Sequence, residues 1–337
     1  MSCFSVHVLE RAISQNSVNP LGDIMAINYV NIKNFKKIII IYNGNSGKQF
    51  FASMMSKMNE IFKHVKAYWG VKNVEFYRLN RFAELDELTE RIAKEEFDWV
   101  IIAGGDGTIR AVIEKLSDRN YLPYFSIIPA GTVNLIAKEL LISNDPYKWM
   151  RRVLKGVEVP VYLGRTNDRT FLTVTGIGFE SLVVDNVTEL EKKLLSKAAY
   201  AWEGAELMRK ELIFSNWRYR FKVRLDDSEE WLEATSVIVG KSRYYAGRYN
   251  LFKGASLSKP ELHVAIFTGA SRADFARYAA CIAMEALEFD KSIIVRKAKK
   301  LEIVCEQGEF AAELDGDAVA TAPLKISIEE KPILFIA

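Results

Sequence analysis

The sequence predicts an α/β domain built on a parallel sheet, followed by a second domain of mostly antiparallel β-structure. From Lys37 to Ile128, short apolar runs alternate with stretches of helical periodicity. This order of strand and helix builds a parallel sheet with right-handed crossovers. Beyond Val157 the pattern changes to alternating strands joined by turn residues. Because 337 residues give room for two cores, we expect a first domain over residues 35–156 and a second over residues 157–330.

The elements of the first domain follow from its hydrophobic pattern. Four apolar runs are predicted to be buried strands: Lys37–Tyr42, Val74–Leu79, Trp99–Ala103 and Tyr124–Ile128. The stretches between them are predicted to be helices: Gln49–Lys66, Phe82–Glu96 and Thr108–Asp118. Residues 1–34 show little periodicity, and no function is assigned to them.

The second domain is predicted from strands that have one polar and one apolar face. Trp217–Leu225 alternates strictly, which places its basic residues on a solvated sheet face: Arg218, Arg220, Lys222 and Arg224. A turn at Asp226–Ser228 leads into a second strand that ends near Gly240. Val159–Gly164 and Thr170–Gly176 are predicted to pair as a hairpin. Further strands are expected at Glu261–Phe267, Ser292–Arg296, Leu301–Cys305, Phe310–Leu314 and Leu324–Ile328, and helices at about residues 180–212 and 272–288.

Composition excludes several classes of protein. The 46 Lys and Arg residues nearly balance 43 Asp and Glu, so the net charge of +3 gives no reason to expect nucleic acid as a partner. Three widely spaced cysteines suit a reducing cytoplasm, and three histidines cannot supply a zinc cluster of the usual spacing. Since no apolar run reaches the roughly 18–20 residues of a membrane span, we expect a cytoplasmic protein that meets a membrane only from the side.

The feature that points most directly to chemistry is a glycine-rich loop between a predicted strand and a predicted helix. It reads Gly104-Gly105-Asp106-Gly107-Thr108. Glycines let the backbone approach a phosphate closely, and the unpaired N–H groups of a helix start favour an anion. A carboxylate among these amides suits Mg²⁺ bridged to phosphates, so we expect Asp106 to contact metal and phosphate rather than a core group. The alternative is an ordinary strand-to-helix turn.

Two further loops follow predicted strands and leave the same edge of the sheet. They are Asn43-Gly44-Asn45-Ser46-Gly47-Lys48 and Pro129-Ala130-Gly131-Thr132-Val133-Asn134. Ligands of open α/β sheets bind outside the carboxyl ends of the strands, so the three loops can surround one nucleotide. The first of the two is not a Walker A loop, because its glycine spacing is too short and Gln49 stands in place of the hydroxyl residue. Each loop by itself is as well explained as a turn with a helix cap.

These motifs, in this order, resemble the diacylglycerol kinase catalytic-domain family of bacterial lipid kinases, which are related to sphingosine kinases. Besides the glycine loop and Pro129–Asn134, the resemblance includes Gly176-Ile177-Gly178-Phe179-Glu180 and the acidic motif Leu314-Asp315-Gly316-Asp317. It extends from about residue 35 to the end of the chain.

The resemblance implies a fold, a reaction and roles for particular residues. It implies a nucleotide-binding domain with an NAD kinase-like sheet, a β-sandwich-like lipid domain with a catalytic cleft between the two, and a return of residues 331–337 to the first domain. ATP would be held by Asn43, Gly104, Gly105, Gly107, Thr108, Gly131, Thr132 and Asn134. Asp106 would organise Mg²⁺, Glu180 would bind the lipid head group or support the acidic network, and Asp317 would be the general base.

The activity implied is transfer of the γ-phosphoryl group of ATP to a diacylglycerol-like or sphingoid-like lipid hydroxyl. The protein would be cytoplasmic and transiently peripheral to a membrane that carries its lipid substrate. Four departures from the family pattern stand out: Leu135 for an Asp, Glu180 for an Asp, Asp317 for a Glu, and Ser258-Lys259-Pro260 where many members carry Asp-Gly. An NAD kinase-like enzyme with a soluble substrate and a nucleotide-binding regulator without turnover are the alternatives.

Overall fold

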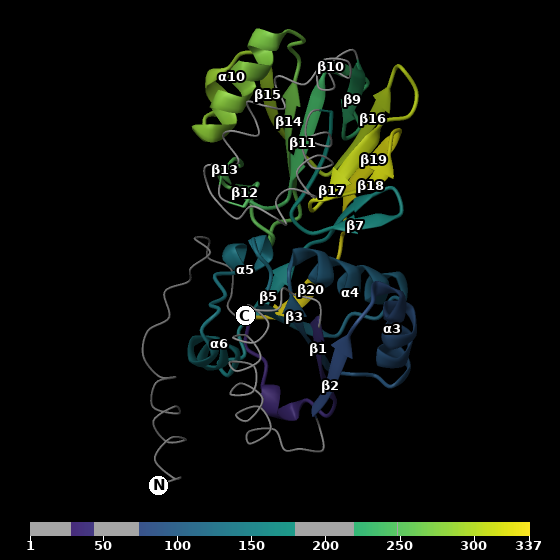
Figure 1. The fold of residues 1–337 in the computed structure, drawn as a ribbon, viewed down its shortest axis with the longest axis vertical. Coiled ribbons are helices and arrows are strands. Elements are labelled where there is room, and N and C mark those ends of the chain that lie inside the picture. The colour runs from purple at the N-terminus through teal and green to yellow at the C-terminus, as the bar shows by residue number, and fades with distance from the viewer. Residues whose placement is uncertain (1–27, 44–73, 179–218, 248) are drawn as a thin grey trace. The chain divides into compact units, whose positions relative to one another are not determined.

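The computed structural model describes residues 28–43, 74–178, 219–247 and 249–337 (Figure 1). It divides into two compact units. The first runs to Val161 and includes Ile333–Ala337, and the second is Tyr162–Pro332. The first unit therefore continues beyond residue 156, and it contains both the predicted parallel sheet and the end of the chain.

The first unit is built on a six-stranded sheet with the order β2-β1-β3-β4-β20-β5. Its strands are β1 (Ile38–Asn43), β2 (Val74–Leu79), β3 (Trp99–Gly104), β4 (Tyr124–Pro129), β5 (Glu158–Val161) and β20 (Ile333–Ile336). The pairings from β2 to β20 are parallel, and β5 is antiparallel to β20. The four strands predicted for the first domain are confirmed. Their apolar runs were informative because a strand that is covered on both faces is apolar throughout, as β3 is.

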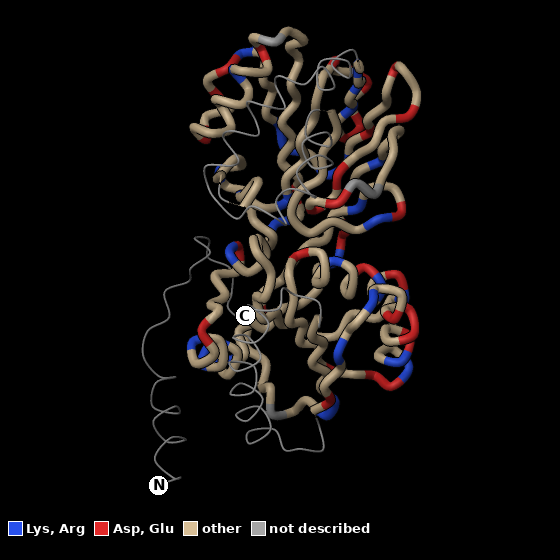
Figure 2. The backbone as a smooth tube through the Cα atoms, viewed as in Figure 1, with Lys and Arg blue, Asp and Glu red and all other residues tan. Residues whose placement is uncertain are grey.

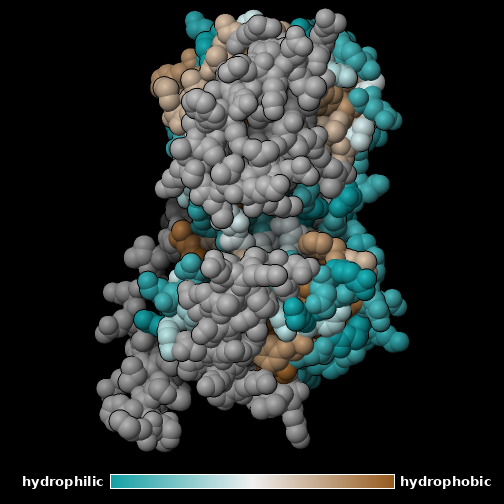
Figure 3. Space-filling model, viewed as in Figure 1, coloured by the Kyte–Doolittle hydropathy of each residue, from teal (hydrophilic) through white to brown (hydrophobic). Residues whose placement is uncertain are grey.

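Helices cover the sheet of the first unit. They are α3 (Leu85–Lys94), α4 (Asp106–Asp118), α5 (Leu135–Glu139) and α6 (Pro146–Val153), with short 3₁₀ turns η2 (Ile32–Asn34) and η4 (Phe82–Glu84). On one face, Trp149 and Val153 of α6 pack with Ile38 and Ile101 in one core cluster. Figure 1 shows α3 and α4 away from α6, and the surface around α3 is hydrophilic in Figure 3. The predicted helices over 82–96 and 108–118 are confirmed, and the one over 49–66 lies outside the described residues.

Strand β20, the end of the chain, lies between β4 and β5. The Ser126 hydroxyl donates to the carbonyl oxygen of Ile336 at 2.6 Å and accepts from the indole N–H of Trp99 at 3.1 Å. Phe335 is fully buried and contacts Phe125, with 5.8 Å between the ring centroids. The last strand is therefore part of the core of the first unit.

The described residues of the second unit form two six-stranded sheets, in the orders β10-β9-β16-β19-β6-β7 and β15-β14-β11-β8-β17-β18, and a two-stranded one. The first sheet comprises β6 (Gly164–Thr166), β7 (Arg169–Phe171), β9 (Phe221–Leu225), β10 (Leu232–Ala234), β16 (Lys300–Cys305) and β19 (Leu324–Ile328). The second comprises β8 (Val174–Ile177), β11 (Ser236–Gly240), β14 (Leu262–Phe267), β15 (Ile293–Ala298), β17 (Ala311–Leu314) and β18 (Asp317–Thr321). The small sheet pairs β12 (Tyr244–Tyr245) with β13 (Tyr249–Asn250). Every pairing in these sheets is antiparallel, as predicted for the second domain.

The two large sheets enclose one core, and helix α10 (Arg272–Ala283) encloses another. Phe221 and Val223 of β9 pack in the first core with Val237 and Val239 of β11. Lys222 and Arg224 of β9 alternate with its core residues and pair with acidic residues at β16. Arg224 pairs with Glu302 of β16 at 2.6 Å, Lys222 pairs with Glu306 just after it, and Figure 2 shows blue and red close together along these strands. The prediction of a solvated basic face is confirmed for the part of the strand that the structure describes.

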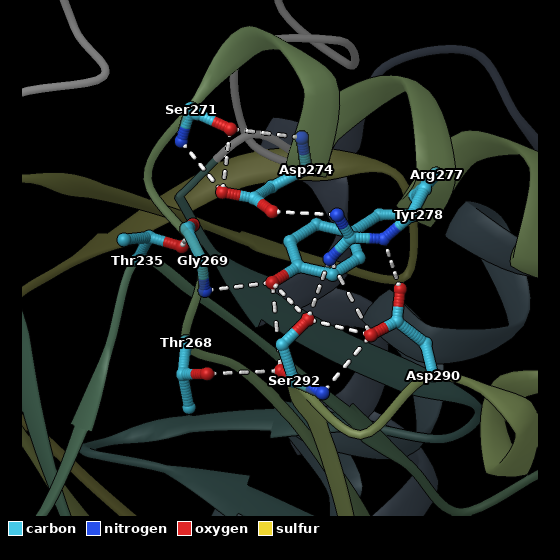
Figure 4. Close-up of polar contacts among 9 residues, drawn as sticks. All are labelled: Thr235, Thr268, Gly269, Ser271, Asp274, Arg277, Tyr278, Asp290 and Ser292. Carbon is cyan, nitrogen blue, oxygen red and sulfur yellow. Dashed lines mark hydrogen bonds and ion pairs between the residues drawn. The ribbon is translucent and has the colours of Figure 1, made fainter.

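Helix α10 is fixed to its sheet by a polar network (Figure 4). The Tyr278 hydroxyl accepts from the amide of Gly269 at 2.6 Å and donates to the Ser292 hydroxyl at 2.9 Å. Arg277 pairs with Asp290 at 2.7 Å. The 3₁₀ turn η5 (Leu287–Phe289) follows the helix, so the predicted helix over 272–288 ends earlier than expected.

The predicted hairpin of Val159–Gly164 with Thr170–Gly176 is wrong. Strand β5 pairs with β20 in the first unit, and the hairpin is formed by β6 and β7 instead. An alternating pattern fits the edge of either sheet, and the partner of β5 lies at the far end of the sequence. The predicted helix over 180–212 lies outside the described residues. In the part of the chain that the structure describes, no helix is long and apolar enough to cross a membrane.

Candidate active site

The glycine-rich loop connects the end of β3 to the start of α4. Gly105 is the N-cap of α4 in an extended conformation, and its carbonyl oxygen accepts from the amides of Thr108 and Ile109 at 3.0 and 3.1 Å. Because the N-cap residue is a glycine, it has no side chain that could cap the first turn of α4. The N-terminal amides of this 13-residue helix lie at the carboxyl edge of a parallel sheet, and the helix dipole has its positive end there. Such an edge is where anionic groups bind.

A second loop lies directly against the glycine-rich loop. The amide of Ala130 donates to the carbonyl oxygen of Gly104 at 3.0 Å. A methyl group added to Gly131 would lie 2.5 Å from the Cα of Gly105, a distance that atoms do not tolerate. Two glycines are therefore needed for this backbone contact, which follows from the parallel register of β3 and β4.

Asn134 closes the second loop on itself. Its side-chain oxygen accepts from the amide of Gly131 at 2.8 Å, and its side-chain NH₂ donates to the carbonyl oxygen of Gly131 at 2.6 Å. The residue has a left-handed backbone, with φ of 54°, which asparagine tolerates better than most side chains. Thr132 and Val133 are exposed at the tip of the loop. Asn134 thus shapes the loop, and Thr132 is the polar side chain at its exposed tip.

The carboxylate of Asp106 connects the two loops. Its oxygens accept from the amides of Leu135 at 2.9 Å and Ile136 at 3.1 Å, the first two residues of α5. Asp106 therefore caps α5 from a neighbouring helix. The expected contact of Asp106 with metal and phosphate stays a prediction. Its role as a cap of α5 was not expected, because the sequence analysis did not predict that helix.

Asn43, at the end of β1, connects the first predicted loop to the same place. Its side-chain NH₂ donates to the hydroxyl of Thr108 at 3.0 Å. Thr108 is buried. The structure thus brings together the residues predicted to hold ATP, from Asn43 to Asn134, on one edge of the first unit. Residues 44–48 of this loop lie outside the described residues.

Asp317 belongs to the second unit, where it begins β18 and faces Leu314 in the register of the β17–β18 hairpin. It is exposed. Asp315 and Gly316 form the turn between the two strands, both with positive φ, of 50° and 92°. The general-base role of Asp317 stays a prediction, as do the roles of the ATP-binding residues. Glu180 lies outside the described residues.

Sequence reasoning did not anticipate the buried Lys241. Its ammonium group donates to the carbonyl oxygens of Ser256, at 2.6 Å, and Lys259. The residue is fully buried, and the Tyr162 ring lies 6.0 Å away. The segment that departs from the family pattern, Ser258-Lys259-Pro260, is thus held by an ammonium group of the chain itself. A lone lysine after a strand gives no sequence signal of this contact.

Two family models match the sequence of this chain. The family model described as the diacylglycerol kinase catalytic domain matches residues 37–166. The model described as the YegS C-terminal NAD kinase beta sandwich-like domain matches residues 173–336. A diacylglycerol kinase of Bacillus subtilis is 27% identical over 292 residues, which cover 84% of this chain and 93% of that protein. A diacylglycerol kinase of Staphylococcus epidermidis is 24% identical over 80% of this chain and 82% of its own length.

Solved structures share the fold. The crystal structure of a diacylglycerol kinase from Bacillus anthracis matches with a TM-score of 0.66 and 19% identity over 90% of this chain and 97% of the other. A second crystal structure from the same organism matches with a TM-score of 0.74 and 21% identity over 96% and 97% of the two chains. The parallel sheet of the first unit and the antiparallel sheets of the second fit both domain models. The chain therefore belongs to the family in which a diacylglycerol kinase catalytic domain precedes a C-terminal NAD kinase beta sandwich-like domain.

Proposed function

We propose that this protein is a lipid kinase that transfers the γ-phosphoryl group of ATP to the hydroxyl group of a lipid. The first unit would bind the nucleotide, and the second would activate the acceptor. Two relatives that align with 80% or more of this chain are named diacylglycerol kinase.

The observation that carries the proposal is the close contact of two glycines at the glycine-capped N-terminus of α4. Gly105 and Gly131 bring two loop backbones together without side chains between them, at a helix N-terminus whose N-cap residue is a glycine. This arrangement suits a polyphosphate, because amide donors and the helix dipole both favour negative charge. It is a poor arrangement for a neutral ligand. Asn43 and Thr132 would add side-chain contacts.

The donors at this edge also fit a magnesium ion carried by the nucleotide. Mg²⁺ typically keeps several waters and takes one or two carboxylates in addition to the phosphates. Asp106 is the residue that would hold it, since its carboxylate lies in the first turn of α4, directly after the glycines of the loop. When bound, the ion would neutralise charge on the transferred group. The capping of α5 by Asp106 would keep that carboxylate in a fixed orientation.

Asp317 would act on the acceptor. In the proposed reaction its carboxylate takes the proton of the lipid hydroxyl, the hydroxyl oxygen bonds to the γ-phosphorus, and the bond to the bridging oxygen breaks to release ADP. Its position at the exposed end of β18 leaves the carboxylate accessible to a substrate. The lipid would be diacylglycerol-like or sphingoid-like and would be presented at a membrane surface, which the protein would contact from the cytoplasm as a peripheral protein.

The proposal is tested by ATP consumption that depends on added lipid. Purified protein would be incubated with ATP and Mg²⁺ and, in separate reactions, with diacylglycerol, phosphatidylglycerol, sphingosine, ceramide or NAD. Consumption with one of the lipids and not with NAD is the expected result. Consumption with NAD alone would identify a soluble-substrate kinase, and nucleotide binding without consumption under any condition would identify a regulator.

A further inference from the structure

The acidic motif 314–317 contains two aspartates whose surroundings differ. Asp317 is exposed at the start of β18. The carboxylate of Asp315 points back to the segment that joins β7 to β8 and accepts four hydrogen bonds there. Because its lone pairs are engaged, Asp315 is a poor candidate for the general base, and its function has to be sought elsewhere.

The donors to Asp315 are three consecutive backbone amides and one hydroxyl. Oδ2 accepts from the amide of Leu172 at 2.7 Å. Oδ1 accepts from the amide of Thr173 at 2.7 Å, from its hydroxyl at 2.5 Å and from the amide of Val174 at 3.1 Å. Burial raises the pKa of the Asp315 carboxyl, and these donors oppose that change because they favour the ionised form. The group is built into the fold as an acceptor for this segment.

The backbone of the turn is held as firmly as its side chain. The amide of Asp315 donates to the carbonyl oxygen of Val174 at 2.9 Å. The amide of Gly316 donates to the carboxylate of Glu313, a buried residue of β17. A two-residue turn in which both residues have positive φ has few alternative conformations once its ends are paired. Since Asp317 is the next residue, the turn fixes the backbone from which its side chain extends.

The 172–174 segment is itself connected to the interior of the second unit. The carbonyl oxygen of Thr173 accepts from the amides of Lys241 at 2.8 Å and Ser242 at 3.0 Å. Lys241 is the buried residue whose ammonium group holds the 256–259 turn. Asp315 therefore joins the hairpin tip to a rigid network and not to a loose loop.

We infer that Asp315 is a positioning residue for Asp317: its carboxylate binds the amides of residues 172–174 and thereby fixes the hairpin turn that orients the Asp317 carboxylate. This inference rests on the proposed function, in which Asp317 accepts the lipid proton. A displacement of about 1 Å in a catalytic group can lower a rate by about 10²-fold, so a loosened turn is expected to affect turnover more than nucleotide binding.

The test uses variants that remove the acceptor or one donor. Asp315→Asn replaces one carboxylate oxygen by an NH₂ group that faces backbone N–H donors, and Thr173→Val removes only the hydroxyl. Asp226→Asn is the matched control, since Asp226 is another turn aspartate of the second unit with positive φ, and it accepts from the amides of Lys299 at 2.7 Å and Lys300 at 3.1 Å. All are assayed in the full chain with the lipid that the wild type phosphorylates, and each is also combined with Asp317→Asn.

We expect Asp315→Asn to lower kcat by about 10- to 100-fold and Thr173→Val by less, with KM for ATP unchanged. In the Asp317→Asn background neither should lower kcat further, because residues that act as a unit are not additive. Asp226→Asn should keep the wild-type kcat. If Asp315→Asn misfolds, Thr173→Val still decides the question.

The inference is overturned if Asp315→Asn and Thr173→Val both keep the wild-type kcat, or if they lower kcat by the same factor in the Asp317→Asn background as in the wild type. It is overturned equally if Asp226→Asn lowers kcat as much as Asp315→Asn does. It is also overturned if Asp317→Asn itself turns over lipid at the wild-type rate. These outcomes require a wild type that phosphorylates lipid. A wild type without lipid-dependent turnover contradicts the proposed function first, and the positioning role falls with it.

Discussion

At the scale of single residues, Asp106 has a structural role beside the chemical one that we propose for it. It caps α5 through the amides of Leu135 and Ile136, and it lies in the first turn of α4, beside the amides that we propose bind phosphate. Its substitution is therefore expected to disturb the second loop even where no metal is involved.

We predict that Asp106→Ala weakens ATP binding both with and without Mg²⁺. Loss of a helix cap costs about 0.5–2 kcal/mol, and here the cost falls on the loop that would contact the nucleotide. Calorimetric titration with ATP, in Mg²⁺ and in a chelator, measures this. A loss of affinity seen only in the presence of Mg²⁺ would mean that Asp106 acts on the metal alone.

A second prediction at this scale concerns Gly131. A methyl group at this position would lie 2.5 Å from the Cα of Gly105, so Gly131→Ala must push the two loops apart. We expect ATP affinity to fall, while Val133→Ala, at an exposed position of the same loop, should leave it unchanged. Equal affinities of the two variants would show that the contact between the loops does not matter for binding.

The sequence predicted the residues of these loops better than their contacts. Glycines after apolar strands are visible in the sequence, and parallel strands bring their carboxyl ends to one edge. The partners of Asp106 were missed because α5 has only five residues and no clear periodicity. Those of Asp315 were missed because its donors lie more than 140 positions away.

At the scale of elements, α10 makes polar contacts with groups just before the following strand, β15, in addition to its apolar packing on the sheet (Figure 4). Arg277 first, and Ser292 next, lower the pKa of the Asp290 carboxyl from 3.8 to about 2. Because this pKa is lower in the folded than in the unfolded chain, the ionised carboxylate stabilises the fold fully above about pH 4. That stabilisation is lost as the pH falls towards about 2.

We predict that Asp290→Asn lowers the Tm of the second unit at pH 7 and that the difference from the wild type shrinks between about pH 4 and pH 2. Thermal unfolding followed by circular dichroism over this range measures it. Asp168→Asn, at an exposed aspartate of the same unit, is the control and should have little effect. A difference in Tm that is the same at pH 2 as at pH 7 would exclude the ion pair as its cause.

The elements that sequence analysis predicted correctly are those whose partners are near in sequence or whose pattern is unambiguous. Strand β3 is apolar at every position, and the stripe of α4 includes Ile109, Val112 and Leu116, all fully buried. Strand β5 was assigned to the wrong sheet because its partner, β20, comes at the end of the chain. The sequence also predicts one strand running up to Gly240, whereas Thr235 separates β10 in one sheet from β11 in the other.

At the scale of the whole molecule, the end of the chain completes the sheet of the first unit. Phe335 is fully buried in β20, whereas its neighbour Leu334 is only half-buried. We predict that Phe335→Ala destabilises the first unit by about 3–5 kcal/mol and that Leu334→Ala costs clearly less. Urea denaturation of both variants measures this. Equal effects would mean that burial of β20 does not stabilise the unit.

The central claim is that the two units together phosphorylate a lipid, with Asp317 as the base. It is tested most directly with ATP labelled in its γ-phosphate and lipid vesicles, by measuring label in the extracted lipid. The wild type is expected to label a diacylglycerol-like or sphingoid-like lipid, and Asp317→Asn to do so about 10²- to 10⁴-fold more slowly while still binding ATP. Lipid without label from the wild type, or equal labelling by Asp317→Asn, would contradict the claim.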